Sequence, residues 1–270
     1  KDFFNLVVFI FHRKPPCFNH FIYNTIRKPE MHYIFIILLI LHTIYSKLML
    51  RCTSKCAFER TVKMAKAIPI IITNTNILLY DKASEEFKPF SLQGVESQPN
   101  IPFYHSFAKK IAESQHYFKE FLKQYYPKKV NKNILAIIVP DDTSPLESIF
   151  INEFFVNSGT CKAVAQMTMA QALSKEHSQY ISISKSSRNV VLQYIRNNEI
   201  KASRYYDRNT YIAPKISEDA KRLHIDIEYE NTPIFINNFN LDMDDFFGIG
   251  TVITPKEFMD KIAQIDVEKI

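Results

Sequence analysis

Two adjacent carboxylates, Asp141 and Asp142, stand where the sequence favours a ligand site. They follow the run Ile134–Val139, which is continuously apolar and rich in β-branched residues, as a strand buried on both faces is. In α/β folds ligands bind beyond the carboxyl ends of such strands. A second interpretation is a plain polar turn, because Ser144 and Glu147 form a capping box that starts a helix directly afterwards. The sequence alone leaves both interpretations open.

Two cations, Lys185 and Arg188, lie in a predicted turn between two predicted strands, residues 179–184 and 189–195. Side chains of this type bind anionic ligands, but a solvated turn carries the same residues. A third polar run, at Asn238, Asn240, Asp242 and Asp244, alternates as calcium-loop ligands do. It lacks the glycine and the final glutamate of an EF-hand, where Met243 and Ile249 stand, so we expect no metal site there.

Catalytic motifs are missing from the rest of the sequence. The histidines show no HExxH spacing, and no serine has a G-x-S-x-G context. The chain has 4 glycines, and a glycine-rich loop that could cradle a nucleotide is absent. We therefore predict no catalytic residue and no resident metal.

Charge and cysteine content differ along the chain. Residues 1–63 hold ten Lys or Arg and three acids, whereas the remainder holds 24 bases and 25 acids, so the overall charge of +6 comes from the N-terminal stretch. A nearly neutral body argues against nucleic acid as a partner. The single cysteine of the body, Cys161, suits a reducing compartment, and we expect a cytoplasmic protein.

The basic N-terminal stretch, residues 1–63, contains a mostly apolar run from Tyr33 to Leu50. Eighteen residues are marginal for crossing a membrane, which takes about 20. Three hypotheses remain open: a single membrane anchor, a segment outside the native protein with Met64 as the natural start, and a folded subdomain. Under the first, the protein contacts the inner face of the membrane.

The remaining chain predicts alternating strands and helices, which indicates an α/β fold with a mixed sheet and flanking helices. A first part spans residues 64–178, and a second, smaller α+β part spans residues 179–270. Strands are predicted at residues 68–73, 77–80, 87–95, 134–139, 162–166, 179–184, 189–195, 203–207, 226–229 and 233–239. Helices are predicted at residues 106–126, from 144, at 167–174, at 217–223 and from 254.

This order resembles the actin-like ATPase superfamily, which has a ribonuclease-H-like architecture, and within it the bacterial rod-shape MreB proteins. The segment from Thr73 to Tyr80 is similar to the family's first phosphate hairpin, D-L-G-T-T-N-T, and the segment from Ile181 to Ser187 stands at the second, D-I-G-G-G-T. Between them, Val139-Pro140 followed by Glu147 resembles the family's V-P strand end and its helix. Residues 162–173 resemble the next strand and helix. Beyond Asn209 no family motif is present, so a complete second half is not expected.

The departures from the family pattern concern the phosphate site. Ile71 and Ser182 stand at the two aspartates, Thr73 stands at the first glycine, and no glycine remains in the second hairpin. Since phosphoryl transfer needs carboxylates for Mg²⁺ and amides against the phosphates, the resemblance implies a pseudo-ATPase without a cofactor. The vestigial phosphate-site positions are Thr73, Asn74, Thr75, Asn76, Asp141, Asp142, Ser184, Lys185 and Ser186.

Three functions follow as hypotheses. The first is a non-catalytic scaffold that binds protein partners or itself, linked to bacterial cell shape or envelope assembly. The second is a weak ATPase of the same superfamily that binds Mg-ATP with Asp141 or Asp142. The third is a membrane-anchored accessory domain held by the run from Tyr33 to Leu50.

Overall fold

A computed structural model of the chain describes residues 67–91, 100–127, 132–174 and 176–265. All of these belong to one compact unit, residues 59–270. The N-terminal stretch, including the run from Tyr33 to Leu50, lies outside the described residues. Among the described residues, no helix has the length and apolar character needed to span a bilayer.

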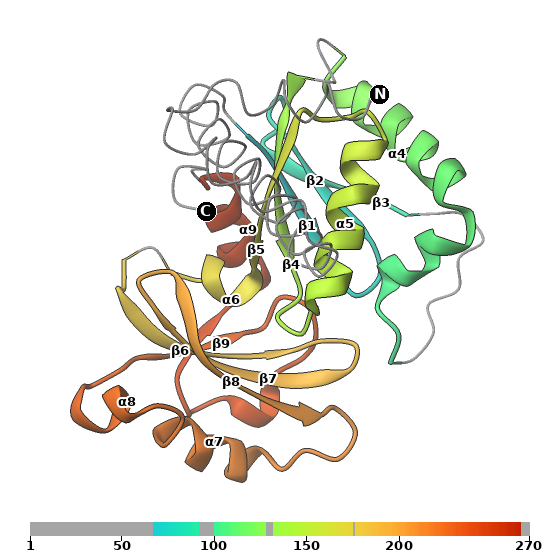
Figure 1. Ribbon diagram of the computed structural model, residues 1–270. Helices are drawn as coiled ribbons and strands as arrows, with labels where there is room; N and C mark the ends of the chain where they lie inside the picture. The colour runs from blue at the N-terminus through green and yellow to red at the C-terminus, as the bar shows by residue number, and fades with distance from the viewer. Residues whose placement is uncertain (1–66, 92–99, 128–131, 175, 266–270) are drawn as a thin grey trace, which may run out of the picture. The chain divides into compact units, whose positions relative to one another are not determined.

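The first sheet has five strands in the order β3-β2-β1-β4-β5 (Figure 1). The strands are β1 Ile68–Ile72, β2 Ile77–Asp81, β3 Glu86–Phe90, β4 Ile134–Val139 and β5 Ala163–Thr168. β1, β2 and β3 are antiparallel neighbours, whereas β4 runs parallel to both β1 and β5. β4 therefore lies inside the sheet, and each of its residues is buried, as its apolar composition predicts.

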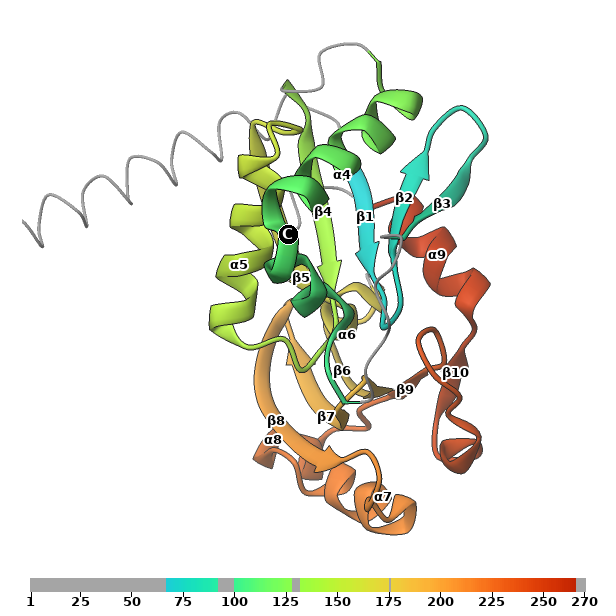
Figure 2. The ribbon, with the colours of Figure 1, turned by 90° about the vertical axis from the view of Figure 1, so that its right-hand side faces the viewer.

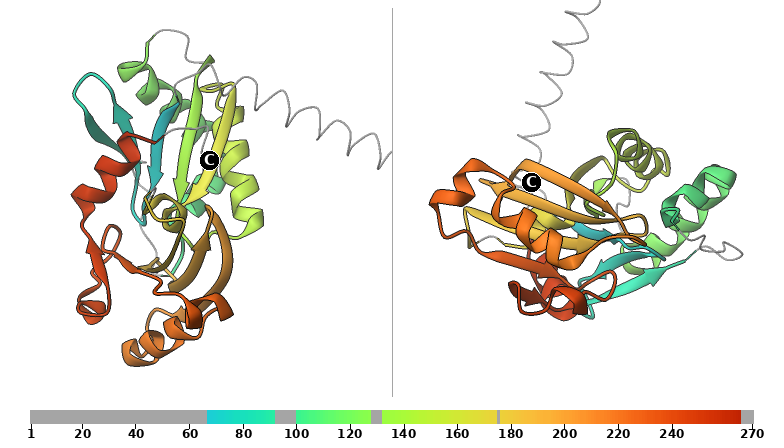
Figure 3. Two further views of the ribbon diagram at one scale, coloured as in Figure 1. Left: turned by 90° about the vertical axis from the view of Figure 1, so that its left-hand side faces the viewer. Right: turned by 90° about the horizontal axis from the view of Figure 1, so that it is seen from below.

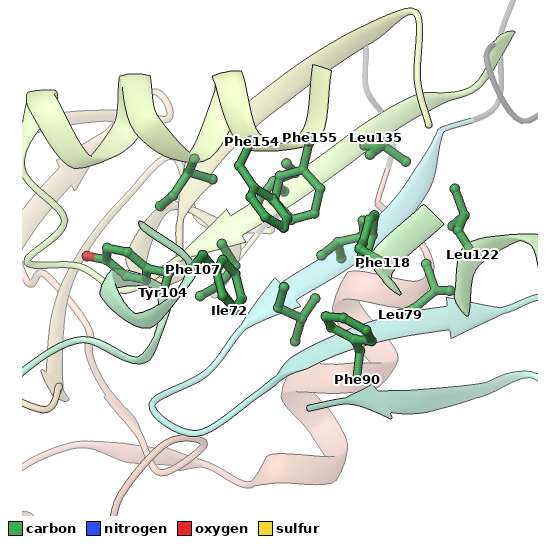
Figure 4. Close-up of a cluster of buried hydrophobic side chains, with 14 of the residues drawn as sticks. Ile72, Leu79, Phe90, Tyr104, Phe107, Phe118, Leu122, Leu135, Phe154 and Phe155 are labelled. Atoms are coloured by element: carbon green, nitrogen blue, oxygen red, sulfur yellow. The ribbon is translucent and has the colours of Figure 1, made fainter. Parts of the chain in front are cut away.

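One face of the first sheet is covered by three helical elements (Figure 2). These are the 3₁₀ helix η2 Phe103–Lys110, α4 Ile111–Tyr125 and α5 Pro145–Asn157. Figure 4 shows their aromatic rings gathered over β1, with Phe107 and Phe154 stacked at a centroid distance of 4.7 Å. α5 begins at the capping box of Ser144 and Glu147, as predicted.

The second sheet has the order β10-β9-β6-β7-β8. Its strands are β6 Gln179–Lys185, β7 Asn189–Arg196, β8 Glu199–Asp207, β9 Ile234–Asn237 and β10 Thr251–Ile253. β6, β7 and β8 are antiparallel neighbours, and β9 runs parallel to both β6 and β10. From β8 to β10, this sheet repeats the strand order and directions of the first.

The helical elements of the second half are short: α7 Ala213–Lys221, α8 Ile225–Tyr229 and the 3₁₀ helix η4 Asp244–Phe246. α7 and η4 pack on one face of the second sheet (Figure 3). Two further helices, α6 Met169–Ala172 and α9 Pro255–Ala263, follow β5 and β10 respectively, and each starts at a capping box, from Thr168 and from Thr254. Both helices pack in a cluster that holds Ile138 of the first sheet and Ile195 of the second.

The α/β class, the mixed sheet with flanking helices and the ribonuclease-H-like strand order are confirmed by this topology. The expectation that a complete second half is missing is wrong, because β6 to β10 and α9 repeat the arrangement of β1 to β5 and α6. The fifth strand explains the error: β10 has 3 residues and was not predicted, whereas β9 lies within the predicted strand at residues 233–239.

Two predicted elements need correction, and one strand was not predicted. Residues 226–229 form part of α8 and no strand, although apolar and polar residues alternate there. His224 accepts a hydrogen bond from the Asp226 amide and begins a helical turn, which leaves Tyr229 80% exposed. α7 begins at Ala213, four residues before the predicted cap at Ser217. The strand β10 was not predicted.

Candidate functional site

The first predicted phosphate-site turn joins β1 to β2, and the Thr73 side chain closes it. Thr73 Oγ1 accepts hydrogen bonds from the Thr75 and Asn76 amides at 3.1 and 3.0 Å. The Thr73 amide donates to Asn76 O at 2.9 Å, and the Asn74 amide donates to Asn240 Oδ1 at 3.3 Å. All four amides of this turn therefore have acceptors within the chain.

Asp141 lies at the carboxyl end of β4 and is 5% exposed. One carboxylate oxygen accepts from the Ala170 amide at 2.6 Å, at the start of α6. The other accepts from Ser184 Oγ of β6 at 2.5 Å. Burial raises the pKa of Asp141 to about 6, against the lowering effect of these two bonds. The carboxylate thus joins the two sheets through neutral donors.

Asp142 meets the second turn, between β6 and β7. Its Oδ2 accepts from Ser186 Oγ at 2.5 Å, from Arg188 Nε at 3.1 Å and from Asn189 Nδ2 at 3.1 Å. The side chain is 3% exposed. Ser186 Oγ also accepts from the Arg188 and Asn189 amides at 3.0 Å each, and the Ser186 amide donates to Asn189 O at 2.8 Å. In this turn too, backbone amides donate to oxygens of the chain, namely those of Ser186, Arg188 and Asn189.

Arg188 extends from this turn to the first turn of α5. Its two terminal nitrogens donate to the two carboxylate oxygens of Glu147 at 2.8 and 3.1 Å, and one of them also reaches Asp142 O at 2.8 Å. We call Arg188, Asp142 and Glu147 the Arg188 latch. Such a bidentate pair is a strong and geometrically specific contact.

Glu147 has two further partners, the Ser144 amide at 2.8 Å and His105 Nε2 at 2.7 Å. Burial by itself raises the pKa of Glu147, but hydrogen bonds from Arg188, Ser144 and His105 outweigh it and lower the pKa to about 2. Glu147 is therefore ionised at neutral pH and pairs with the guanidinium. From the sequence, Glu147 was expected as a helix cap and His105 was not expected at this site.

Lys185, at the end of β6, contacts the segment between β9 and β10. Its Nζ donates to Asp242 O at 2.8 Å, lies 3.4 Å from Asp245 Oδ2, and sits 5.0 Å from the centre of the Tyr211 ring. The lysine is held against the loop that precedes β10 and is 11% exposed. Of the two cations in this turn, Arg188 contacts Asp142, whereas Lys185 contacts Asp242 and Asp245.

Apart from Lys185, the predicted site residues thus fall into three groups. Asp141 with Ser184, and Asp142 with Ser186, are brought together directly. Thr73, Asn74, Thr75 and Asn76 form a separate turn, whose link to the second half is Asn240. In the sequence, the latch is indicated by the acidic residues that follow β4. The carboxylates of Asp142 and Glu147 need a nearby cation once they are buried.

In the alternating polar run after β9, side-chain oxygens accept hydrogen bonds from backbone amides. Asn238 Oδ1 accepts from the Met243 amide at 3.0 Å, and Asp242 Oδ1 accepts from the Asp244 amide at 3.1 Å. Side chains used in this way shape a turn. Within the part of the chain that the structure describes, no group of three or more His, Cys, Asp and Glu residues is placed to hold a metal ion.

A cavity of about 340 Å³ lies beside the start of β6, not at its carboxyl end. Its lining includes Gln171, His177, Tyr180, Asn197 and Ile265. None of the predicted site residues lines this cavity.

A scan against protein-family models finds no match, and a search of curated proteins finds none. Solved structures with a similar chain trace exist. Ethanolamine utilization protein EutJ from Carboxydothermus hydrogenoformans is 9% identical, with 73% of this chain and 88% of that chain covered and a TM-score of 0.43. The AlfA filament bound to AMPPNP is 12% identical, with 74% and 95% covered and a TM-score of 0.43.

MreB5 of Spiroplasma citri bound to ADP is 10% identical, with 59% of this chain and 56% of that chain covered and a TM-score of 0.37. These scores are low, so the fold assignment rests on the strand order of the chain itself. Two five-stranded sheets in the same order, each followed by a helix that packs between them, form the actin-like ATPase fold.

Proposed function

We propose that this protein is a non-catalytic member of the actin-like group, a pseudo-ATPase that acts as a scaffold through protein contacts. This proposal rests on the hydrogen bonds of the backbone amides in the two turns. Thr73, Asn74, Thr75 and Asn76 in the first turn all donate to oxygens of the chain, and so do three amides of the second. A phosphate needs such amides unpaired and facing it.

The carboxylates support the same conclusion. Mg²⁺ needs oxygen ligands that are free to face it. Both carboxylate oxygens of Asp141 accept from the protein, and Asp142 Oδ2 accepts three bonds. Ile71 and Ser182 provide no carboxylate at the positions that match the family. The alternative of a weak ATPase would require Asp141 or Asp142 to leave these partners.

We infer that the Arg188 latch takes over a structural role that a bound phosphate has in the family. Arg188 and Ser186 tie the second turn to Asp142 and to the first turn of α5, so the two halves are joined by the protein's own groups. A scaffold benefits from such a fixed arrangement, because its partner surfaces stay in one geometry.

The outer face of α5 is a candidate surface for protein contacts. Leu146, Ile149 and Val156 are 77%, 59% and 42% exposed, at helical spacing, while Ile151, Phe154 and Phe155 on the other side are buried. Glu153 and Asn157 are also exposed on this helix, so polar side chains accompany the apolar ones, as at a protein–protein contact site. We include self-association through this face in the proposal.

The remaining parts of the proposal are bacterial origin, a role in cell shape or envelope assembly, and a cytoplasmic location. Contact with the inner face of the membrane depends on the run from Tyr33 to Leu50. Fractionation after a high-salt wash tests that contact, since a membrane-held chain stays in the pellet.

Thermal unfolding of the full chain with and without millimolar Mg-ATP tests the pseudo-ATPase. We expect no change in Tm and no phosphate release above buffer, with an active actin-like ATPase as the positive control. A ligand that binds the native state at about 100 times its Kd adds about 2.7 kcal/mol of stability, which shifts Tm by several degrees. A shift of that size, or turnover, would overturn the proposal in favour of the weak ATPase. Sedimentation of the same samples measures self-association.

A further inference from the structure

The free edges of the two sheets differ in how well they are protected against pairing with another strand. The first sheet ends at β3, which has 5 residues and includes Pro89, and at β5, whose residues are all buried or half-buried. The second sheet ends at β10, which has 3 residues, and at β8, which has 9 and no proline. Short strands and prolines are common protections of a sheet edge. Within the described part of the chain, β8 is therefore the edge that is long and open enough to accept a further strand (Figure 2).

The backbone of β8 alternates between groups that pair with β7 and groups that face outward. The Arg208 amide donates to Arg188 O at 3.0 Å, in the register of the β7–β8 ladder. In an antiparallel ladder such bonds come from every second residue. The N–H and C=O groups of Ser203 and Tyr205 therefore lie on the open edge of β8 and are available to another strand.

The side chains of β8 carry charges of both signs. Lys201 lies near the start of the strand and Asp207 at its end, and both are exposed. Arg204 lies between them and pairs with Asp219 of α7 at 2.6 Å. Tyr205 is 55% exposed. Charged side chains on an edge strand keep other strands away, except a strand that places opposite charges against them.

We propose that β8 pairs with β8 of a second copy of this chain, antiparallel and around a two-fold axis at Arg204. This register places Lys201 of each copy opposite Asp207 of the other. It also sets Ser203 opposite Tyr205, and these two residues exchange their outward main-chain hydrogen bonds. The second sheets of the two copies then join into one continuous sheet.

The charges of β8 select this register over its neighbours. With the axis at Ser203, Glu199 lies against Asp207, and these like charges repel. With the axis at Tyr205, no two opposite charges of β8 face each other. The chosen axis brings two guanidinium groups near each other, but each is balanced by Asp219 of its own copy. The junction goes beyond the proposed function, because it uses a different surface from α5 and does not depend on the nucleotide site.

Sedimentation velocity of the full chain over a range of concentrations, without nucleotide, tests the junction. We expect a concentration-dependent dimer. Ser203→Pro removes an outward N–H but no bond to β7, so the dissociation constant should rise roughly 100-fold while Tm stays near that of the wild type. Ser203→Ala keeps the N–H and is the matched control, which should dimerise as the wild type does. A wild type that stays monomeric, or a Ser203→Pro variant that dimerises unchanged, overturns the proposal.

A pair of charge variants tests the register. Lys201→Asp and Asp207→Lys each place like charges across the junction, so each variant alone should dimerise less than the wild type. Mixed in equal amounts they should form a mixed dimer, because each facing pair then has opposite charges. A mixture that stays monomeric overturns the register. Ile149→Glu, on the outer face of α5, should leave the dimer intact, and loss of the dimer in that variant alone assigns self-association to α5 and overturns the β8 junction.

Discussion

The turns that follow β1 and β6 occupy equivalent places in two sheets of the same strand order, yet they are held in different ways. Both turns are closed locally by a hydroxyl that accepts two amides from within three residues, Thr73 in the first turn and Ser186 in the second. The second turn also has a charged contact with a distant element, since Arg188 pairs with Glu147, 41 residues away in sequence, whereas the distant contact of the first turn is one amide that donates to Asn240. Strand pairing therefore preserves the topology, while one or two side chains decide what each turn contacts.

Removing the distant contact is expected to have the largest effect on stability. Arg188→Ala leaves Asp142 and Glu147 as buried carboxylates without their cation, which costs about 3 kcal/mol of unfolding free energy. Urea unfolding at pH 7 measures it. The control is Arg204→Ala, which breaks the more exposed pair with Asp219 and should cost less than about 1 kcal/mol. Equal losses in the two variants would show that the latch is no stronger than a surface pair.

A smaller effect is expected from Glu147→Gln, which keeps the cap but removes the charge. Because the folded pKa of Glu147 lies near 2 and the unfolded value is about 4.3, its contribution is present above pH 4.3 and is lost as the pH falls towards 2. The wild type should be more stable than the variant at pH 7 by about 2 kcal/mol, a difference that disappears near pH 2. Unfolding curves over this pH range measure it, and a constant difference would contradict the ionic role.

The smallest effect is expected in the first turn. Thr73→Ala removes an acceptor for two amides that water can replace, so the cost is about 1 kcal/mol. Thr75→Ala, at an exposed position in the same turn, should be within about 0.5 kcal/mol of the wild type. A loss for Thr73→Ala as large as that for Arg188→Ala would remove the contrast between the two turns.

Elements with strong local signals were predicted well from the sequence. The continuous apolar run of β4 and the capping boxes before α5 and α9 correspond to elements in the structure. β5, β6 and β7 lie within two residues of their predicted ends. These segments contain their own start and stop signals, so their form depends little on the rest of the chain.

Other elements were missed because their form depends on distant contacts. The alternation of residues 226–229 is typical of a strand, yet α8 forms there, where Arg196 pairs with Asp226. β10 has three residues and exists through its pairing with β9. In the site, Asp141 and Asp142 were found from their place after β4, but a sequence does not show that Ser184, Ser186 and Arg188 would be their partners.

The sequence by itself determined that residues 71–76 and 182–187 contain no glycine and no aspartate, because this is a matter of residue identity. It also determined the order of strands and helices in the first half, through local periodicity and caps. Only the tertiary structure decided that β6 to β10 repeat that order and that the second turn is latched to α5. These features depend on side chains that are 40 or more residues apart and that become neighbours only when both sheets have formed.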